Sequence, residues 1–141
     1  MNFKLITLDG VKVDEPVYEV IIPTTTGVIS VFPSHEPLVT VAAPGVVAVR
    51  HDKRHSDDEL EYFAISGGAI DIDRKSVRIL VDEAERGDDI IEAETQAALD
   101  RAIKMRDEAK SMVDLDKAHE LVDRQKVRLK VADLQRRKKR R

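Results

Sequence analysis

The chain has 141 residues, of which 42% are hydrophobic and 36% are charged, with a net charge of −3 and no cysteine. This length suits one or two small domains and excludes a large α/β enzyme, and the missing cysteines exclude disulfide frameworks and thiolate zinc sites. No apolar run approaches the roughly 20 residues of a membrane span, and the first residues lack the apolar core of a signal peptide. We therefore expect the chain in the cytosol or on its membrane face.

Residues 1–87 are predicted to form an all-β sandwich domain. All five prolines lie between Pro16 and Pro44, and all six glycines lie at or before Gly87. Short apolar runs alternate with these turn residues, which favours an antiparallel sandwich or barrel over a parallel βαβ sheet. The expected strands cover residues 5–8, 17–22, 28–31, 38–41, 46–49, 60–65, 69–72 and 77–81.

Residues 88–141 are predicted to form a second domain, an antiparallel hairpin of two helices, so that the chain is α+β overall. Asp89 is the expected N-cap of the first helix, and the second helix is expected after the polar segment 114–116. Both helical faces are rich in small residues and bury little area, which predicts a mobile or partner-dependent hairpin. The two stripes are Ile91, Thr95, Ala98, Ala102, Met105, Ala109 and Met112, then Ala118, Val122, Gln125, Leu129 and Ala132.

Positive charge is concentrated at the end of the chain. Residues 1–86 carry 9 Lys and Arg against 15 Asp and Glu, a net −6, whereas residues 87–141 carry 15 against 12, a net +3. Two interpretations of this basic tail stay open: a disordered, solvated terminus, or an electrostatic contact with an acidic surface. The tail has no aromatic residue to stack on bases, so nucleic acid is not an expected partner. It consists of Arg136, Arg137, Lys138, Lys139, Arg140 and Arg141.

The sequence contains no strong catalytic or metal-binding motif. Ser66 precedes two glycines, which favours a turn or bulge between strands over a nucleophile elbow. His51 and His55 are four residues apart, but they lie in a charged loop, where solvated side chains are expected in place of a metal site. His35 lies in a loop bracketed by prolines and is expected to be structural or part of an interface.

Four segments, in order, resemble the epsilon subunit of the bacterial-type rotary ATP synthase. The first is GVISVFPSHEPLVT at residues 27–40, which is similar to the Gly-x-x-Gly-Ile-x-Pro-Gly-His-x-Pro-Leu segment of that family. The others are PGVV at 44–47, FAISGG at 63–68 and AER at 84–86. Ser30 and Ser34 stand where the family commonly has glycine.

This resemblance implies a non-catalytic subunit of the central stalk in a proton-translocating ATP synthase. The implied partners are the gamma subunit, the c-ring and the alpha/beta catalytic head, at the cytoplasmic face of the bacterial cell membrane. The loop around Val28 would face the c-ring, and the loop of Ser34, His35 and Glu36 would face gamma and the head. The hairpin would either fold against the sandwich or extend along gamma into the head, where it blocks ATP hydrolysis. On electrostatic grounds we expect the basic tail to contribute to that block.

Some members of this family bind ATP through an Ile/Leu-Asp-x-x-Arg-Ala stretch that opens the first helix. Aligned from residues 84–86, this chain has Ile91 in place of the aspartate and Glu94 in place of the arginine. Asp100 and Arg101 occur as neighbours, about 100° apart on a helix, and cannot replace the spaced pair. Because a carboxylate repels phosphate, we expect ATP binding to be weak or absent, and no other cofactor.

Two other functions remain open at this point. The chain could be a freestanding sandwich-plus-coil adaptor that binds RNA or acidic membrane through its basic tail. It could also be an enzyme that uses Ser66 and scattered carboxylates. Co-purification with a large ATPase would distinguish the stalk subunit from both.

Overall fold

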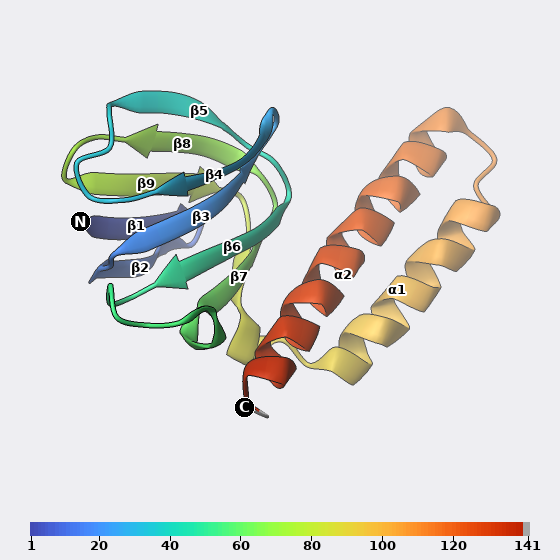
Figure 1. Ribbon diagram of the computed structural model, residues 1–141. Helices are drawn as coiled ribbons and strands as arrows, with labels where there is room; N and C mark the ends of the chain where they lie inside the picture. The colour runs from blue at the N-terminus through green and yellow to red at the C-terminus, as the bar shows by residue number, and fades with distance from the viewer. Residues whose placement is uncertain (140–141) are drawn as a thin grey trace.

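The computed structural model describes residues 1–139, in which ten strands form a sandwich and two helices follow (Figure 1). Short 3-10 turns cover Asp57–Glu59 and Gly87–Asp89, and the second of these leads into the helices α1 (Glu92–Asp107) and α2 (Met112–Lys139). The strands are β1 (Asn2–Thr7), β2 (Gly10–Pro16), β3 (Glu19–Thr24), β4 (Gly27–Val31), β5 (Leu38–Ala42), β6 (Gly45–Arg50), β7 (Glu61–Ile65), β8 (Gly68–Ile72), β9 (Ser76–Val81) and β10 (Ala84–Arg86).

The strands are hydrogen-bonded in the order β10-β7-β6-β3-β5-β8-β9-β1-β2, and β4 pairs with β3. Strand β3 links the two layers, because residues 19–21 pair with β6 whereas Thr24 pairs with Ala42 of β5. All pairs are antiparallel except β1 with β9, which is parallel. The fold class predicted from the sequence is therefore confirmed, with one parallel pair inside an otherwise antiparallel arrangement.

A single apolar core fills the space between the layers. It contains 18 buried residues, and the rings of Phe3 and Phe63 meet edge to face with centroids 6.2 Å apart. Strand β9 has the alternation expected of a half-buried strand: Val77, Ile79 and Val81 point into the core, while Arg78 points outward. Every residue of this core precedes residue 87.

Two strands were not predicted from the sequence. Strand β2 has only one buried side chain, Val13, because charged residues alternate with its valines. Strand β10 has three residues, too few for an alternation to be detected. Both lie at the ends of the strand order, where a strand has only one neighbour and needs less apolar surface.

The second predicted helical stripe is confirmed, since its members on α2 are buried or half-buried. The first is correct only in part. Thr95 and Ala102 are buried as expected, but Ile91, Met105 and Met112 are exposed. Leu99, which the predicted stripe omitted, packs between α1 and α2. Ile91 does not reach this interface because it lies before the helix, and the residues from Met105 onward approach the exposed far end of the hairpin.

The predicted boundaries of the helices also need correction. Asp89 belongs to the 3-10 turn, and the N-cap of α1 is Ile91, whose side chain cannot cap. Helix α2 begins at Met112, so segment 114–116 lies in its first turn, where acidic residues suit the helix dipole. Among residues 1–139, neither helix combines the length and hydropathy that crossing a bilayer demands.

The glycine pair after Ser66 forms the predicted turn between β7 and β8. Gly67 has φ of +99° and Gly68 has φ of +155°, in the region that favours glycine. A Cβ atom at Gly68 would lie 2.0 Å from the carbonyl oxygen of Leu80. This close approach lets β8 pair with β9 directly after the turn.

We predict that Gly68→Ala lowers the free energy of unfolding by about 3 kcal/mol, because the added Cβ collides with the backbone of β9. The matched control is Gly27→Ala, where φ is +129° but no atom lies within 4 Å of the added Cβ. This control should lose only the strain of the backbone conformation, about 1 kcal/mol. Urea unfolding of both variants measures the difference, and equal losses would contradict the prediction.

Candidate functional site

Helix α2 packs on the outer face of β6 and β7 (Figure 1). The contact surface, here called the seam, is small and apolar. Val131 is fully buried in it, and Ala64 of β7 is 7% exposed. Because residue 64 is an alanine, the helix can approach the strand closely at this point. The remaining apolar members of the seam are Ile90 and Ala132, with Val46, Tyr62 and Val127 partly buried around them.

Strand β7 is buried on both faces. Phe63 and Ile65 point into the sandwich core, whereas Tyr62 and Ala64 point outward to α2. Burial raises the pKa of the Tyr62 hydroxyl above its ordinary value. The seam and the sandwich core are thus two separate clusters that share one strand, and opening the seam leaves the core closed.

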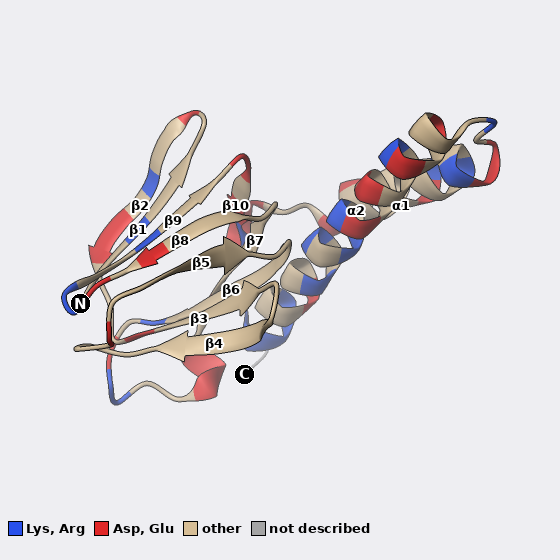
Figure 2. Ribbon diagram, turned by 90° about the horizontal axis from the view of Figure 1, so that it is seen from above, with Lys and Arg blue, Asp and Glu red and all other residues tan. Residues whose placement is uncertain are grey.

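Ion pairs on one side of the seam join α2 to β10 and the loop before it. Arg128 Nη2 lies 3.1 Å from Glu85 Oε2, and Arg124 Nη1 lies 3.5 Å from Glu83 Oε2. Figure 2 shows charges of both signs along α2. All four side chains are at least a quarter exposed, so water and salt weaken these pairs.

A second group of contacts joins the end of α2 to the root of the hairpin, and we call it the C-terminal latch. Gln135 Nε2 donates to Asp88 Oδ1 at 2.9 Å, and Lys139 Nζ lies 2.9 Å from the same oxygen. Arg136 Nη1 lies 3.1 Å from Glu92 Oε1. Glycine at position 87 makes room for this arrangement, because a Cβ there would lie 2.9 Å from the amide oxygen of Gln135.

The Lys139 ammonium, helped by the Gln135 amide, holds the pKa of Asp88 below its ordinary value. A carboxyl group whose pKa is lower in the folded state than in the unfolded state stabilises the folded state above its unfolded pKa, about 3.9. This stabilisation disappears as the pH falls through the folded pKa. The latch is therefore intact at neutral pH.

The structure decides between the two interpretations of the basic tail for residues 136–139. These residues continue α2, and Arg136 and Arg137 also pair with Asp133 on the same helix. These residues are therefore helical and not disordered, their side chains remain largely exposed, and their acidic partners belong to the same chain. Arg140 and Arg141 lie outside the described residues.

A groove with a volume of about 610 Å³ lies between α2 and the sandwich beside the seam. Six carboxylates line it, and its two arginines, Arg124 and Arg128, are already paired with Glu83 and Glu85. Such a lining repels phosphate groups. The carboxylates are Asp9, Asp82, Glu83, Glu85, Glu120 and Asp123.

The three positions of the expected degenerate ATP motif lie outside this groove. Ile91, the residue before α1, and Glu94 and Arg101 within α1 are all exposed. The carbonyl oxygen of Ile91 accepts hydrogen bonds from the amide and the hydroxyl of Thr95. Within residues 1–139, the fold does not bring these three side chains and the two arginines of the groove into one site.

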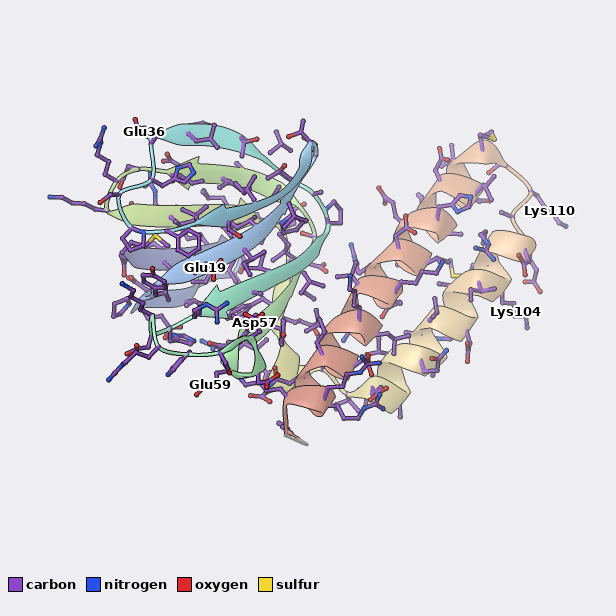
Figure 3. All side chains as sticks on the ribbon, viewed as in Figure 1. Glu19, Glu36, Asp57, Glu59, Lys104 and Lys110 are labelled. Atoms are coloured by element: carbon purple, nitrogen blue, oxygen red, sulfur yellow. The ribbon has the colours of Figure 1, made fainter. Side chains whose placement is uncertain are left out.

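The predicted interface residues lie on the sandwich. Val28 on β4 is 70% exposed, and β5 exposes Val39 and Val41. Glu36, which contacts Arg74 at 3.2 Å, lies at the end of the sandwich away from the helices (Figure 3). Whether these side chains contact a partner stays a prediction.

The loop of Ser34, His35 and Glu36 keeps the backbone of a glycine-containing loop. Ser34 has φ of 69°, a conformation that glycine adopts more easily. His35 Nδ1 lies 2.6 Å from the carbonyl oxygen of Glu36, so the ring donates to its own loop. Ser30, in contrast, lies in the extended strand β4, where serine needs no special conformation.

Ser66 and His51, two further candidates from the sequence, contact other residues of the sandwich. Ser66 Oγ accepts a hydrogen bond from the Glu83 amide at 3.0 Å, which ties the β7–β8 turn to the segment before β10. His51 lies between Glu15 and Glu61, and His55 lies outside this group. The spacing of the histidines could not indicate this, because both carboxylates come from other strands.

A buried ion pair closes the end of the sandwich near this histidine. Glu19 is 7% exposed, and its Oε1 lies 2.8 Å from Nε of Arg50 on the neighbouring strand β6. Asp57 binds the same guanidinium at 2.6 Å, and these two carboxylates raise the pKa of Arg50 (Figure 3). Removing one partner of such a buried pair is strongly destabilising, so the pair is structural.

The sandwich matches the family model of the ATP synthase delta/epsilon chain beta-sandwich domain over residues 1–87. An ATP synthase epsilon chain of Synechococcus elongatus is 37% identical over 102 residues, which cover 72% of this chain and 71% of the relative. Epsilon chains of Rippkaea orientalis and Herpetosiphon aurantiacus are 33% identical. They match over 94% and 96% of this chain, and over 96% of each relative.

Two solved structures share the fold. A chain in the Euglena gracilis mitochondrial ATP synthase (OSCP/F1/c-ring) superposes with a TM-score of 0.73 at 23% identity, covering 86% of this chain and 74% of that one. A chain in the central stalk/c-ring of the Tetrahymena thermophila mitochondrial ATP synthase has a TM-score of 0.60 at 13% identity. It covers 94% of this chain and 96% of that one.

We predict that Val131→Ala loosens α2 from the sandwich. The substitution removes buried apolar surface from the centre of the seam, which should destabilise the docked helix by about 1–3 kcal/mol. Amide hydrogen exchange should become faster along α2 and stay unchanged in β1 and β9. Val113→Ala, at an exposed position on the same helix, is the control, and equal acceleration in both variants would contradict the assignment.

Proposed function

The chain belongs to the ATP synthase epsilon chains, and from this membership we propose that it is the non-catalytic subunit of the central stalk. In this proposal it couples the c-ring and the gamma subunit to the alpha/beta catalytic head, at the cytoplasmic face of a bacterial membrane. Its hairpin inhibits ATP hydrolysis. Because the chain belongs to this family, we prefer the stalk subunit to the hypothesis of a freestanding adaptor.

The observation that carries this proposal is the separation of the two apolar clusters. The sandwich core has 18 buried residues, and the seam under α2 has four. The hairpin can therefore leave the sheet while the sandwich remains folded and anchored. Because so little buried surface holds the hairpin, a partner can shift the equilibrium between its docked and its extended state.

The sandwich offers the surfaces for permanent contacts. The apolar face around Val28, Val39 and Val41 supports docking on the c-ring, because these side chains gain by leaving water. The loop of Ser34, His35 and Glu36 supports the contact with gamma and the head, since its backbone is held by its own hydrogen bonds. Ser66 is engaged with the backbone, in keeping with a subunit that does no chemistry.

The hairpin described here is the folded, non-inhibiting form in this proposal, and the latch favours that form. The basic tail was expected to strengthen inhibition by pairing with the head. In the folded hairpin, however, Arg136 and Lys139 already pair with Glu92 and Asp88. Extension breaks these contacts before new ones form, so the tail restrains the hairpin.

We predict that deleting residues 88–141 raises ATP hydrolysis by the assembled motor, because the blocking element is lost. The double variant Asp88→Asn with Glu92→Gln should lower hydrolysis, because it weakens the latch and favours extension. Two exposed pairs are worth about 0–1 kcal/mol each, so the ratio of folded to extended hairpin should shift by up to roughly 30-fold.

Steady-state hydrolysis by the reconstituted complex measures these effects. Glu108→Gln with Asp116→Asn is the control, since it removes the same charges from exposed hairpin positions outside the latch. If the deleted and complete subunits give equal rates, the inhibitory role is wrong. If the double variant behaves like the control, the hairpin is inhibitory but the latch does not hold it.

We also predict that the full chain does not bind ATP with micromolar affinity. The groove beside α2 is lined by six carboxylates, and Glu94 replaces the expected cation of the motif. Calorimetric titration with ATP tests this, and micromolar binding would contradict it. Ile91→Asp with Glu94→Arg restores both motif positions and should increase the affinity, whereas Ile91→Asn with Glu94→Gln should not.

A further inference from the structure

Glu15, His51 and Glu61 lie together at one edge of the sandwich, and the proposed function does not use them. They come from β2, from the residue after β6 and from the first position of β7. Strands β2 and β10 are the two ends of the strand order, and β7 is the neighbour of β10. The group therefore bridges the opening between the two edges of the sandwich.

The ligand atoms of the three residues lie close together, with the two carboxylates facing different nitrogens of the His51 ring. His51 Nε2 lies 2.6 Å from Glu61 Oε2, and His51 Nδ1 lies 3.7 Å from Glu15 Oε1. One atom from each of the three side chains lies within 4.8 Å of the others. Ligands around a tetrahedral Zn²⁺, with bonds of about 2.0–2.2 Å, are roughly 3.3 Å apart. The ion would bind one ring nitrogen of His51, and the carboxylate that faces the other nitrogen would turn toward it.

Charge and burial at this group favour a cation. The side chains of Glu15, His51 and Glu61 are 35%, 32% and 23% exposed, and Oε1 of Glu15 is buried without a hydrogen bond among the described residues. Within residues 1–139, the guanidinium of Arg86 pairs with Glu61 only, so the carboxylate of Glu15 has no cation beside it while the imidazole is neutral. An unsatisfied buried carboxylate oxygen is costly, and a metal ion would satisfy it.

Arg86 supplies the outer contact that metal sites commonly have. Its guanidinium binds Oε1 of Glu61 and lies over the Phe63 ring, 5.4 Å from the ring centroid. Glu61 is therefore held on one oxygen and presents the other, Oε2, to His51. Outer contacts of this kind orient the carboxylates that bind metals.

From this geometry we propose that Glu15, His51 and Glu61 form a binding site for Zn²⁺, with water completing the coordination. One histidine and two carboxylates are ligands that Zn²⁺ accepts, and such a set leaves a position for water. The bound ion takes the place of the proton that now lies between the ring and a carboxylate. It would join β2 to β7 and close the edge of the sandwich.

Calorimetric titration of the full chain with Zn²⁺ in a non-chelating buffer tests the proposal. We expect one ion per chain, and an affinity at least about tenfold weaker in His51→Ala and in Glu15→Gln. The matched control is His55→Ala, which removes a histidine of the same loop that lies outside the group and should change the affinity less than twofold. Glu15→Gln keeps the size of the side chain, so it remains informative if His51→Ala fails to fold.

Nuclear magnetic resonance of the imidazole groups locates the ion. The chain has four histidines, and Zn²⁺ should shift the ring resonances of His51 and leave His35, His55 and His119 unchanged. Absence of binding to the native chain would overturn the proposal. So would binding that His55→Ala weakens as much as His51→Ala does.

Discussion

Strand β7 is the element on which the arrangement of the whole chain depends, because it is buried on both faces. Phe63 and Ile65 close the sandwich core, and Ala64 forms the floor on which α2 lies. A strand normally presents one face to water when its sheet is antiparallel. Here the second face is apolar but small, so it holds a helix without making that helix part of the core.

The contacts around the seam differ in strength from those inside the sandwich. The core depends on apolar burial, which salt does not screen as it screens charge pairs. The contacts of α2 beside the seam are ion pairs such as Arg128 with Glu85, and those at its end are the C-terminal latch. Exposed pairs are weak singly and are screened by salt. The chain thus combines a large apolar core with a helix pair held to it by a small apolar cluster and by exposed ion pairs.

Acidic side chains determine what the rest of the molecule can bind. The groove beside α2 has the size of a ligand site, but six carboxylates line it and its arginines are occupied. Near the start of β7, Glu15 and Glu61 surround His51, where the same chemistry attracts a cation. Val28 on β4 and Val39 and Val41 on β5 are exposed apolar side chains, and the proposed function assigns them to a protein partner. Each surface therefore selects a different class of ligand.

The sequence by itself determined the order of the fold, because no glycine, proline or aromatic residue follows Gly87 and the periodicity there changes from two to near 3.6. It also determined the α2 stripe that faces α1. Only the tertiary structure decided that α2 has a second buried face at Val131, that Lys139 meets Asp88, and that His51 joins two carboxylates. These contacts join residues far apart in the chain, and local spacing carries no information about such distances.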